Sequence, residues 1–321
     1  MLRRDFLTAT LLLAAGTGRG QPASTDWPNR PIRLVVPVTP GGLTDIPARL
    51  LAAHMSRTLG QQVVVENRPG ASGTIASDLV RKLPPDGYAL LYCTAASHAQ
   101  SPAFRRNVPY NPVTDFMPVA RAVVSPFAIL CRAGRPERTM EELLATARRE
   151  GRLTFGTTGP ASTGHIFALQ IAGAKGVAVE PIHFGGDSPA IQEVLAGRLD
   201  LHYAAAARQY VEAGLLRALA TTGANRWDVF PDAPTLLELG VPDSDLSGWN
   251  GILAPVGTPA EVVAKLNAAV GLALADAEVT QRLAAVGLTP HPTTAAGFGA
   301  FMADEFARYQ AIAANFNLHL D

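Results

Sequence analysis

The sequence predicts an α/β protein built of two domains. Short apolar runs rich in β-branched residues alternate with segments of helical periodicity along most of the chain. The chain beyond its N-terminal apolar segment, about 300 residues, is longer than one ordinary hydrophobic core requires. Two strand–loop–helix junctions of similar composition occur, one near residue 40 and one near residue 158. Ligands of open α/β sheets bind at the carboxyl ends of strands, so we expect the two junctions to lie in different domains and to face each other across a cleft.

The first part of the chain predicts strands and helices from simple patterns. Residues 32–36 are an apolar β-branched run, and 46–59 carry an apolar stripe at helical spacing. A strand at 63–66, a loop and a helix at 74–83 follow, and Pro84, Pro85, Asp86 and Gly87 form a turn before the strand that starts at Ala89. Residues 119–131 read as a long extended segment interrupted at 125–126.

The rest of the chain continues the same alternation. Glu/Arg pairs at helical spacing mark residues 139–149 as an amphipathic helix. Residues 153–156 are a short apolar strand that runs into a loop rich in Gly and hydroxyl groups, and 166–174 are helical. Further strands are predicted at 180–184, 199–204, 216–222 and 251–255, and further helices at 261–275 and 296–315.

Residues 1–20 predict an export signal. Arg3 and Arg4 form a basic start, residues 6–15 are mostly apolar, and small residues follow. This run is shorter than the roughly 20 apolar residues that span a bilayer. The paired arginines are compatible with both the twin-arginine route and the general secretory route. We therefore expect a soluble protein outside the cytoplasm, in the periplasm.

Composition narrows the classes of partner. Apolar residues make up 48% of the chain and charged residues 17%, which is typical of a globular protein. Lys plus Arg equals Asp plus Glu at 27 each, and no basic run occurs, so nothing favours binding to nucleic acid or to an anionic membrane.

Cys93 and Cys131 are the only cysteines. They could pair in an oxidising compartment, but their places in two separate strand-like runs favour two buried thiols that do not meet. The sequence has no metal-binding motif and implies no cofactor.

The first junction, at residues 37–45, has the chemistry of an anion site. A Gly-Gly loop joins the end of a strand to the start of a helix, where free N–H groups and the positive end of the helix dipole converge. The loop lacks the Lys of a phosphate-binding P-loop and the spacing of a dinucleotide fingerprint, so a carboxylate fits better than a phosphate. The alternative is that Gly41 and Gly42 only form a tight turn and that Thr44 or Asp45 only caps the helix.

An enzyme is the main competing class. The chain contains no G-x-S-x-G elbow, no HExxH motif, no P-loop and no Rossmann fingerprint. Ser162, His165 and Asp187 could be drawn as a hydrolase triad, but nothing in their spacing requires it. A hydrogen bond within its own loop is the simpler role for His165. We therefore expect a binding protein and no catalytic residues.

Several short segments together resemble one known family. They are spread over nearly the whole chain, at residues 31–37, 40–45, 65–71, 85–88, 108–112, 197–201, 216–220, 231–235 and 254–259. In composition and order they resemble the Bug family, the extracytoplasmic solute receptors of tripartite tricarboxylate transporters.

This resemblance implies a two-domain periplasmic binding protein of the type II-like Venus-flytrap class, with two crossing segments and a ligand cleft between the domains. Domain 1 would comprise residues 27–124 plus 250–321, and domain 2 residues 125–249. The receptor would act as a monomer, bind a small organic acid and deliver it to the membrane subunits of a tripartite tricarboxylate transporter. An alternative is a sensor that docks on a membrane signalling partner.

The resemblance also implies the ligand-binding residues, which would act largely through backbone N–H groups and ordered water. Carried onto this chain they are Thr39, Pro40, Gly41, Gly42 and Asp45 in the first loop, Ala71, Ser72, Gly73, Ala96 and Ser97 beside it, Thr157, Thr158, Gly159, Ser162, Thr163 and His165 in the facing loop, and Phe184, Gly186 and Asp187 closing from the second domain.

The sequence departs from the family pattern at three places. One is Leu43, a bulky residue at the rim where a third Gly is common. The other two face the predicted cleft. Phe184 is followed by Gly-Gly-Asp where the family often has a basic residue, and His202 begins a stretch of Tyr and Ala where members usually carry Asp/Asn and Pro. We therefore predict a monocarboxylate, or a mixed aromatic or apolar acid, in preference to citrate. Asp45 could bind a ligand ammonium group or cap its helix, and we favour the cap. Asp187, which we expect to lie in a loop, has the same choice or could be a solvated surface acid.

Overall fold

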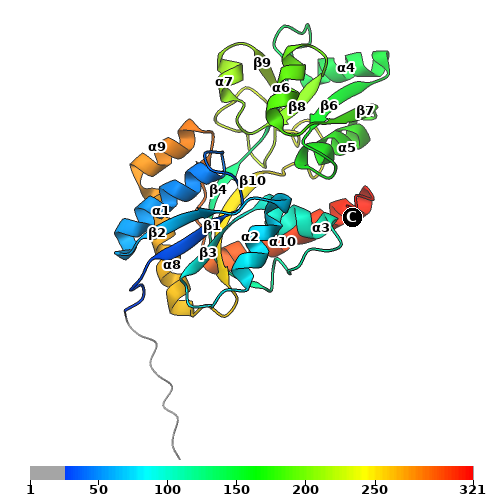
Figure 1. Cartoon of the computed structure of the whole chain (residues 1–321). Coiled ribbons are helices and arrows are strands. Elements are labelled where there is room, and N and C mark those ends of the chain that lie inside the picture. The colour runs from blue at the N-terminus through cyan, green and yellow to red at the C-terminus, as the bar shows by residue number, and fades with distance from the viewer. Residues whose placement is uncertain (1–25, 321) are drawn as a thin grey trace, which may run out of the picture.

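The computed structural model describes residues 26–320, and the predicted export signal at 1–20 lies outside them. Two separate β-sheets, each flanked by helices, form two lobes (Figure 1). No helix in the described part of the chain has both the length and the apolar character needed to cross a membrane.

The first sheet has six strands in the order β11-β4-β10-β3-β1-β2. Strand β1 pairs in parallel with β2 and β3, whereas β10 pairs antiparallel with both β3 and β4. Strand β11 pairs antiparallel with β4. The strand bounds are β1 Ile32–Val36, β2 Val63–Asn67, β3 Ala89–Thr94, β4 Phe116–Ser125, β10 Gly248–Pro255 and β11 Thr289–Pro290. The helices of this lobe are α1 Asp45–Leu59, η1 Ala71–Gly73, α2 Thr74–Arg81, η2 Ala96–Gln100, α3 Ser101–Phe104, α8 Ala260–Ala275, α9 Ala277–Ala285 and α10 Ala295–Asn315.

The second sheet has five strands in the order β7-β6-β8-β5-β9. Strand β6 pairs in parallel with β7 and β8, and β5 pairs antiparallel with β8 and β9. The strand bounds are β5 Ala128–Arg132, β6 Leu153–Thr157, β7 Val179–His183, β8 Leu201–Ala204 and β9 Leu216–Thr221. The helices of this lobe are α4 Met140–Glu150, α5 Thr163–Lys175, α6 Asp187–Leu195 and α7 Arg208–Glu212.

The chain crosses between the sheets twice. It leaves the first sheet after Ser125, enters the second at Ala128, and returns between Thr221 and Gly248. Figure 1 shows β4 and β10 running together at the junction of the lobes. This arrangement confirms the predicted α/β Venus-flytrap fold class.

Packing joins the two lobes at the crossing strands. The largest buried apolar cluster contains residues of the first sheet such as Leu91, residues of the second such as Phe155, and Trp249 on the returning segment. Two further clusters cover the outer face of each sheet, one around Leu34 and one around Ala128. The lobes therefore share a hydrophobic core at the hinge, while each keeps a core of its own.

Most predicted elements are present, and the differences have local causes. Asp187 was expected to lie in a loop, but it is the first residue of α6, so this prediction was wrong. An acidic first turn followed by Pro189 suits a helix start, and the apolar residues Ala190, Ile191 and Val194 bury one face. The short helices α7 and α9 and the two-residue strand β11 were not predicted.

Cys93 and Cys131 are free and buried in different sheets, which confirms that they do not pair.

Candidate functional site

A cleft lies between the two sheets, at the carboxyl ends of their parallel strands. It contains a cavity of about 240 Å³ lined by Leu43 and Thr44 of the first lobe and by Thr163 and Asp187 of the second. A second cavity of about 490 Å³ adjoins it, because Ala96 and Gln100 line both. The second cavity is closed on the other side by residues 158–162.

Helix N-termini surround these two cavities. Thr44 precedes α1, Ser72 lies in the turn before α2, Thr163 begins α5, and Asp187 begins α6, and each of these residues lines a cavity. The first N–H groups of a helix lack intrahelical acceptors, and the helix dipole places partial positive charge there. The cleft therefore favours an anion even though few cationic side chains line it.

The first loop is held in place by a buried carboxylate. Asp45 is only 1% exposed, and its Oδ2 accepts hydrogen bonds from Gly41 N–H at 2.8 Å and Arg49 Nε at 2.7 Å. Its Oδ1 accepts a third from Asn67 Nδ2 at 2.7 Å. Burial acts to raise the pKa of Asp45, but the hydrogen bonds from Arg49, Asn67 and Gly41 bring the pKa below its ordinary value. The carboxylate therefore has its partners within the protein. It does not cap α1 as the N-cap residue, which is Thr44.

The rest of this loop lies outside both cavities. Thr39, Pro40, Gly41 and Gly42 are exposed, and the neighbouring Leu43 and Thr44 are the loop residues that reach the cleft. Gly41 has a positive φ of 87°, which suits its glycine identity at the bend.

The turn before α2 has an unusual backbone. Gly70, Ala71, Ser72 and Gly73 all have positive φ, at 128°, 47°, 54° and 91°. For Ala71 and Ser72 this left-handed conformation is strained, and such strain is concentrated at binding sites. Ser72 lines the larger cavity, Ala71 is exposed beside it, and Gly73 is buried.

The segment after β3 contributes one predicted contact and one residue that was not predicted. Ala96 lines both cavities, whereas the Ser97 hydroxyl is buried and bonds within its own turn, to Thr94 and to His98 Nδ1. Gln100 donates from Nε2 to Thr163 Oγ1 at 2.6 Å and to Tyr309 OH at 3.2 Å. The first of these bonds connects the two lobes across the cleft. Nothing in the sequence pattern distinguishes Gln100, because its role depends on the placement of α5.

In the facing loop, residues 157–165, two threonine hydroxyl groups form hydrogen bonds with aromatic side chains of the second lobe. Thr157 Oγ1 is 2.5 Å from His183 Nδ1, and Thr158 Oγ1 is 2.9 Å from Tyr203 OH. Gly159 has a positive φ of 132° and lines the larger cavity. Thr163 is buried and lines the smaller cavity, where it meets Gln100.

No hydrolase triad is assembled here. The Ser162 side chain caps α5 by accepting from His165 N–H, and His165 Nδ1 accepts from Ala161 N–H at 3.0 Å. Burial, with His183 nearby, lowers the pKa of His165. Asp187 contacts His202 instead. The prediction that His165 is hydrogen-bonded within its own loop is confirmed, and the triad drawn from the sequence is not formed.

Asp187 forms the acidic end of the cleft. Its side chain is 50% exposed, lines the smaller cavity, and places Oδ1 3.3 Å from Nε2 of the fully buried His202. His202 Nδ1 is 2.9 Å from Gly156 O, and because a carbonyl only accepts, Nδ1 carries a proton. Nε2 has no hydrogen-bond partner among the described residues. A protonated His202 would form an ion pair with Asp187 at this distance.

The remaining predicted residues lie behind Asp187. Phe184 donates its N–H to Thr157 O and packs against the outer cluster of the second sheet, and Gly186 is the N-cap of α6. Neither lines the two cavities. Residues 26–320 contain no cluster of three or more His, Cys, Asp or Glu side chains that could hold a metal ion.

Comparison with known proteins gives a consistent result. The family described as "Tripartite tricarboxylate transporter family receptor" matches residues 47–318. Protein BugT of Bordetella pertussis is 33% identical over 306 residues, which cover 94% of this chain and 94% of BugT.

Two solved structures with ligands are also similar. An R. palustris protein with adipate has a TM-score of 0.79 and 34% identity, and the match covers 92% of this chain and 99% of that one. MatC from Rhodopseudomonas palustris, with bound malate, has a TM-score of 0.74 and 32% identity, and the match covers 89% of this chain and 99% of MatC.

Proposed function

Because the chain belongs to the tripartite tricarboxylate transporter receptor family, we propose that it is a periplasmic solute-binding receptor for a small organic acid. It would deliver the acid to the membrane subunits of a tripartite tricarboxylate transporter by closing its cleft, without catalysis. The observation that carries the proposal is the set of helix N-termini, those of α1, α2, α5 and α6, around the two cavities between the sheets.

We further propose that the two domains divide at the crossing segments, as residues 27–124 plus 250–321 and residues 125–249. The passage between sheets after Ser125 and the return before Gly248 support these limits. Closure would then be a rotation about the crossing segments, with the Gln100–Thr163 hydrogen bond formed in the closed state.

The proposed ligand carries one carboxylate at the larger cavity and no second carboxylate near Asp187. Adipate and malate, the ligands of the two similar structures, are both dicarboxylates. In this chain the Asp187 carboxylate lines the smaller cavity and would repel a second negative charge. At a separation of about 6 Å and an effective dielectric constant of about 40, two like charges repel by about 1.4 kcal/mol, a factor of about ten in affinity. A distal hydroxyl, ammonium or apolar group avoids this repulsion, and Asp187 would accept a hydrogen bond from the first two.

A thermal-shift screen of the purified receptor tests the proposal. The panel contains monocarboxylates, hydroxy acids, amino acids, aromatic acids, adipate, malate and citrate, with neutral amides as controls. A ligand at about 100 times its Kd stabilises the folded state by about 2.7 kcal/mol, which corresponds to a rise of roughly 5–10 °C in the unfolding midpoint. If only neutral or cationic compounds raise the midpoint, the carboxylate function is wrong.

The variant Asp187→Asn tests the proposed preference for monocarboxylates separately from the proposed receptor function. It should raise the affinity for adipate or malate about tenfold, while Asp232→Asn, at an exposed site that lines neither cavity, should leave it unchanged. Dicarboxylates that bind the unmodified protein as tightly as any monocarboxylate would contradict the proposed specificity but leave the receptor function intact.

Delivery of the acid to a transporter is tested by uptake of the best ligand into cells that lack the receptor gene, with and without the gene restored.

A further inference from the structure

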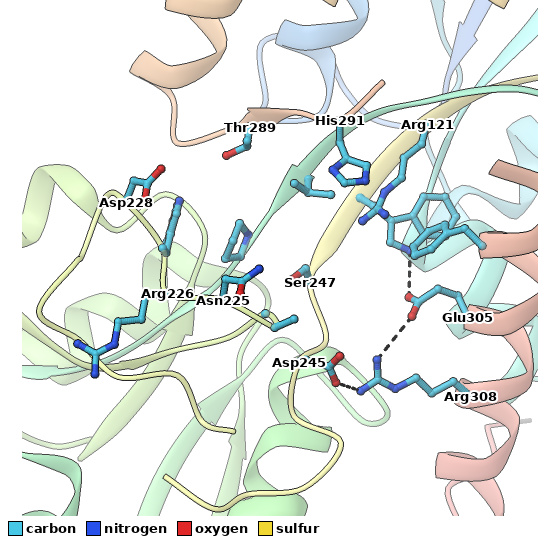
Figure 2. A pocket seen from close by; sticks show the side chains of 17 residues that line it. Arg121, Asn225, Arg226, Asp228, Asp245, Ser247, Thr289, His291, Glu305 and Arg308 are labelled. Atoms are coloured by element: carbon cyan, nitrogen blue, oxygen red, sulfur yellow. Dashed lines mark hydrogen bonds and ion pairs between the residues drawn. The ribbon is translucent and has the colours of Figure 1, made fainter. Parts of the chain in front are cut away.

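A third cavity, of about 560 Å³, lies behind the hinge (Figure 2). Successive residues of an extended segment point to opposite sides, and the crossing segments follow this rule. Val124, Pro126 and Ser247 line the rear cavity, whereas Ser125, Phe127 and Gly248 line the ligand cleft. The two cavities therefore lie on opposite faces of the same crossing segments, and Trp249 borders both of them.

The rear cavity has one wall from each lobe. Arg121 of β4, His291 after β11, and Phe301, Glu305 and Arg308 of α10 form the wall on the side of the first sheet. Residues 223–228, which follow β9 of the second sheet, form the opposite wall. A rotation that closes the cleft in front moves these two walls apart, and a rotation that opens the cleft brings them together.

Arg121 is the unpaired cation of this cavity. None of the ion pairs formed within residues 26–320 includes it, and its Nε is buried without a hydrogen-bond partner among those residues. Its guanidinium lies 3.8 Å from the centre of the Phe301 ring. Burial lowers the pKa of Arg121 to about 10, so the group is still protonated at neutral pH. Figure 2 shows His291 next to Arg121, and burial together with this positive charge lowers the pKa of His291.

The other charges of the cavity already have partners. Arg308 contacts Asp245 and donates to Asp243 O at 2.8 Å, and Glu305 accepts from Trp249 Nε1 at 3.1 Å (Figure 2). Arg226 points away from the cavity toward Glu238, with its Nε 3.0 Å from the carboxylate. The charge of Glu305 acts to raise the pKa of Arg121, but the two side chains form no ion pair. A guanidinium with no anion in contact, beside a partly hydrophobic space, matches a ligand that brings its own carboxylate.

The apolar part of the lining indicates the body of that ligand. Trp227, Trp249, Phe301, Val124 and Pro126 provide aromatic and aliphatic surface next to Arg121. A volume of about 560 Å³ is within the usual range for sites of small organic molecules. An inorganic ion would leave most of this apolar surface uncovered.

We propose that the rear cavity is a second binding site, for a small organic acid with an apolar or aromatic body, whose carboxylate pairs with Arg121. An occupant of this size keeps the rear walls apart, so its binding favours the state in which the ligand cleft is closed. The proposal of this second site does not depend on which solute the cleft binds.

The test uses phenylacetate as the probe, because Trp227 lines the rear cavity. Trp249 lines both the rear cavity and the smaller cavity of the cleft, so the Arg121 variant is needed to assign the fluorescence change to the rear site. Titration monitored by tryptophan fluorescence should saturate for the unmodified protein. Arg121→Gln should weaken phenylacetate binding at least tenfold, since a hydrogen-bonded charge is removed. The matched control Arg208→Gln changes an exposed arginine that lines neither this cavity nor the cleft, and should bind phenylacetate like the unmodified protein.

Two further arms test the chemistry of the ligand. Benzyl alcohol, which has the ring without the charge, and inorganic phosphate, which has charge without the ring, should each bind more weakly than phenylacetate. Equal binding of benzyl alcohol, or equal losses in the Arg121 and Arg208 variants, would overturn the proposal.

Small-angle X-ray scattering tests the coupling to closure. Phenylacetate should reduce the radius of gyration of the unmodified protein and leave that of Arg121→Gln unchanged. An expansion, or a compaction that persists in Arg121→Gln because the probe fills the front cleft, would show that the rear site does not promote closure.

Discussion

Replacing Asp45 by alanine should destabilise the protein and loosen the loop between β1 and α1. The carboxylate is 1% exposed and accepts hydrogen bonds from Gly41, Arg49 and Asn67. Alanine removes all three acceptor contacts and leaves these donors without their partner. Gly41 would then lose the contact that fixes it at the bend of the loop.

The size of the effect follows from how well each donor can be rehydrated. The Arg49 side chain is 49% exposed and Gly41 is also exposed, so water replaces much of their lost interaction. Asn67 is half-buried and bonds to a charged acceptor, which makes its loss the costliest. Bonds to charged groups contribute about 1.5–3 kcal/mol each when shielded, so we expect a total loss of about 2–4 kcal/mol. This corresponds to a fall of roughly 4–16 °C in the unfolding midpoint.

The matched control is Glu212→Ala. Asp45–Arg49 and Arg208–Glu212 are both ion pairs at helical i,i+4 spacing, but the side chains of the second pair are 51% and 63% exposed. An exposed pair of this kind contributes about 0.3–0.5 kcal/mol, so the control should shift the midpoint by about 1–2 °C. If Asp45→Ala unfolds within the error of Glu212→Ala, the carboxylate does not hold the loop.

The pH dependence supplies an independent check. Hydrogen bonds hold the pKa of Asp45 below its ordinary value of 3.8 in the folded state, so the unfolded chain takes up this proton first as pH falls. The stabilisation by Asp45 is fully present above pH 3.8 and is lost as the pH falls through the lower folded pKa. The midpoint difference between the unmodified protein and Asp45→Ala should therefore be constant from pH 5 to 7 and shrink below pH 3.8. A difference that grows in acid would refute the assignment.

Three further variants test the hinge, the packing of the second lobe and a buried base. Gln100→Ala removes the hydrogen bond to Thr163 across the cleft, so the unliganded protein should show a larger radius of gyration in X-ray scattering and bind its ligand several-fold more weakly. Gly164→Ala places a Cβ 2.1 Å from the nearest carbon of the Tyr203 ring and should cost about 1–3 kcal/mol in urea unfolding, with partial recovery when Tyr203→Leu is added. Burial lowers the pKa of His98 to about 3, so its contribution to stability is lost as pH falls from 6.5 toward 3, and His98→Phe should flatten that part of the stability profile.

The strands and the long helices were predictable because their signals are local. The run at 32–36 and the stripe through 46–59 correspond to β1 and α1 within one residue. Helix α6 was missed because Gly185 and Gly186 precede it and a loop was the simpler reading of a Gly-Gly-Asp sequence. Its apolar face is recognisable only with the partner surface in place, since Ile191 and Val194 pack in the outer cluster of the second sheet.

The site was predictable as two junctions but not as a set of side chains. The sequence placed Thr158 and Thr163 on one side of a cleft, and both line its cavities. It gave no sign that Gln100 would reach Thr163, or that His202 would stand behind Asp187, because these contacts join segments 63 and 15 residues apart in the chain through tertiary packing. Asp45 was weighed between ligand contact and helix capping, and its partners support neither, because the carboxylate binds its own loop.

The two sides of the proposed site differ in kind, and this difference bears on where specificity arises. The first lobe presents the strained turn at 70–73 and the loop tip at Leu43 and Thr44, so its polar groups are mainly backbone N–H groups. Backbone groups recognise a carboxylate but do not distinguish one acid from another. The second lobe presents Asp187 with His202 behind it, and these side chains lie where the sequence departs from the family pattern. On the proposed mechanism, the first lobe binds the carboxylate and the second lobe, which contacts the rest of the ligand only on closure, selects the molecule. Exchanging Asp187 should therefore change which acids promote closure without abolishing the binding of carboxylates.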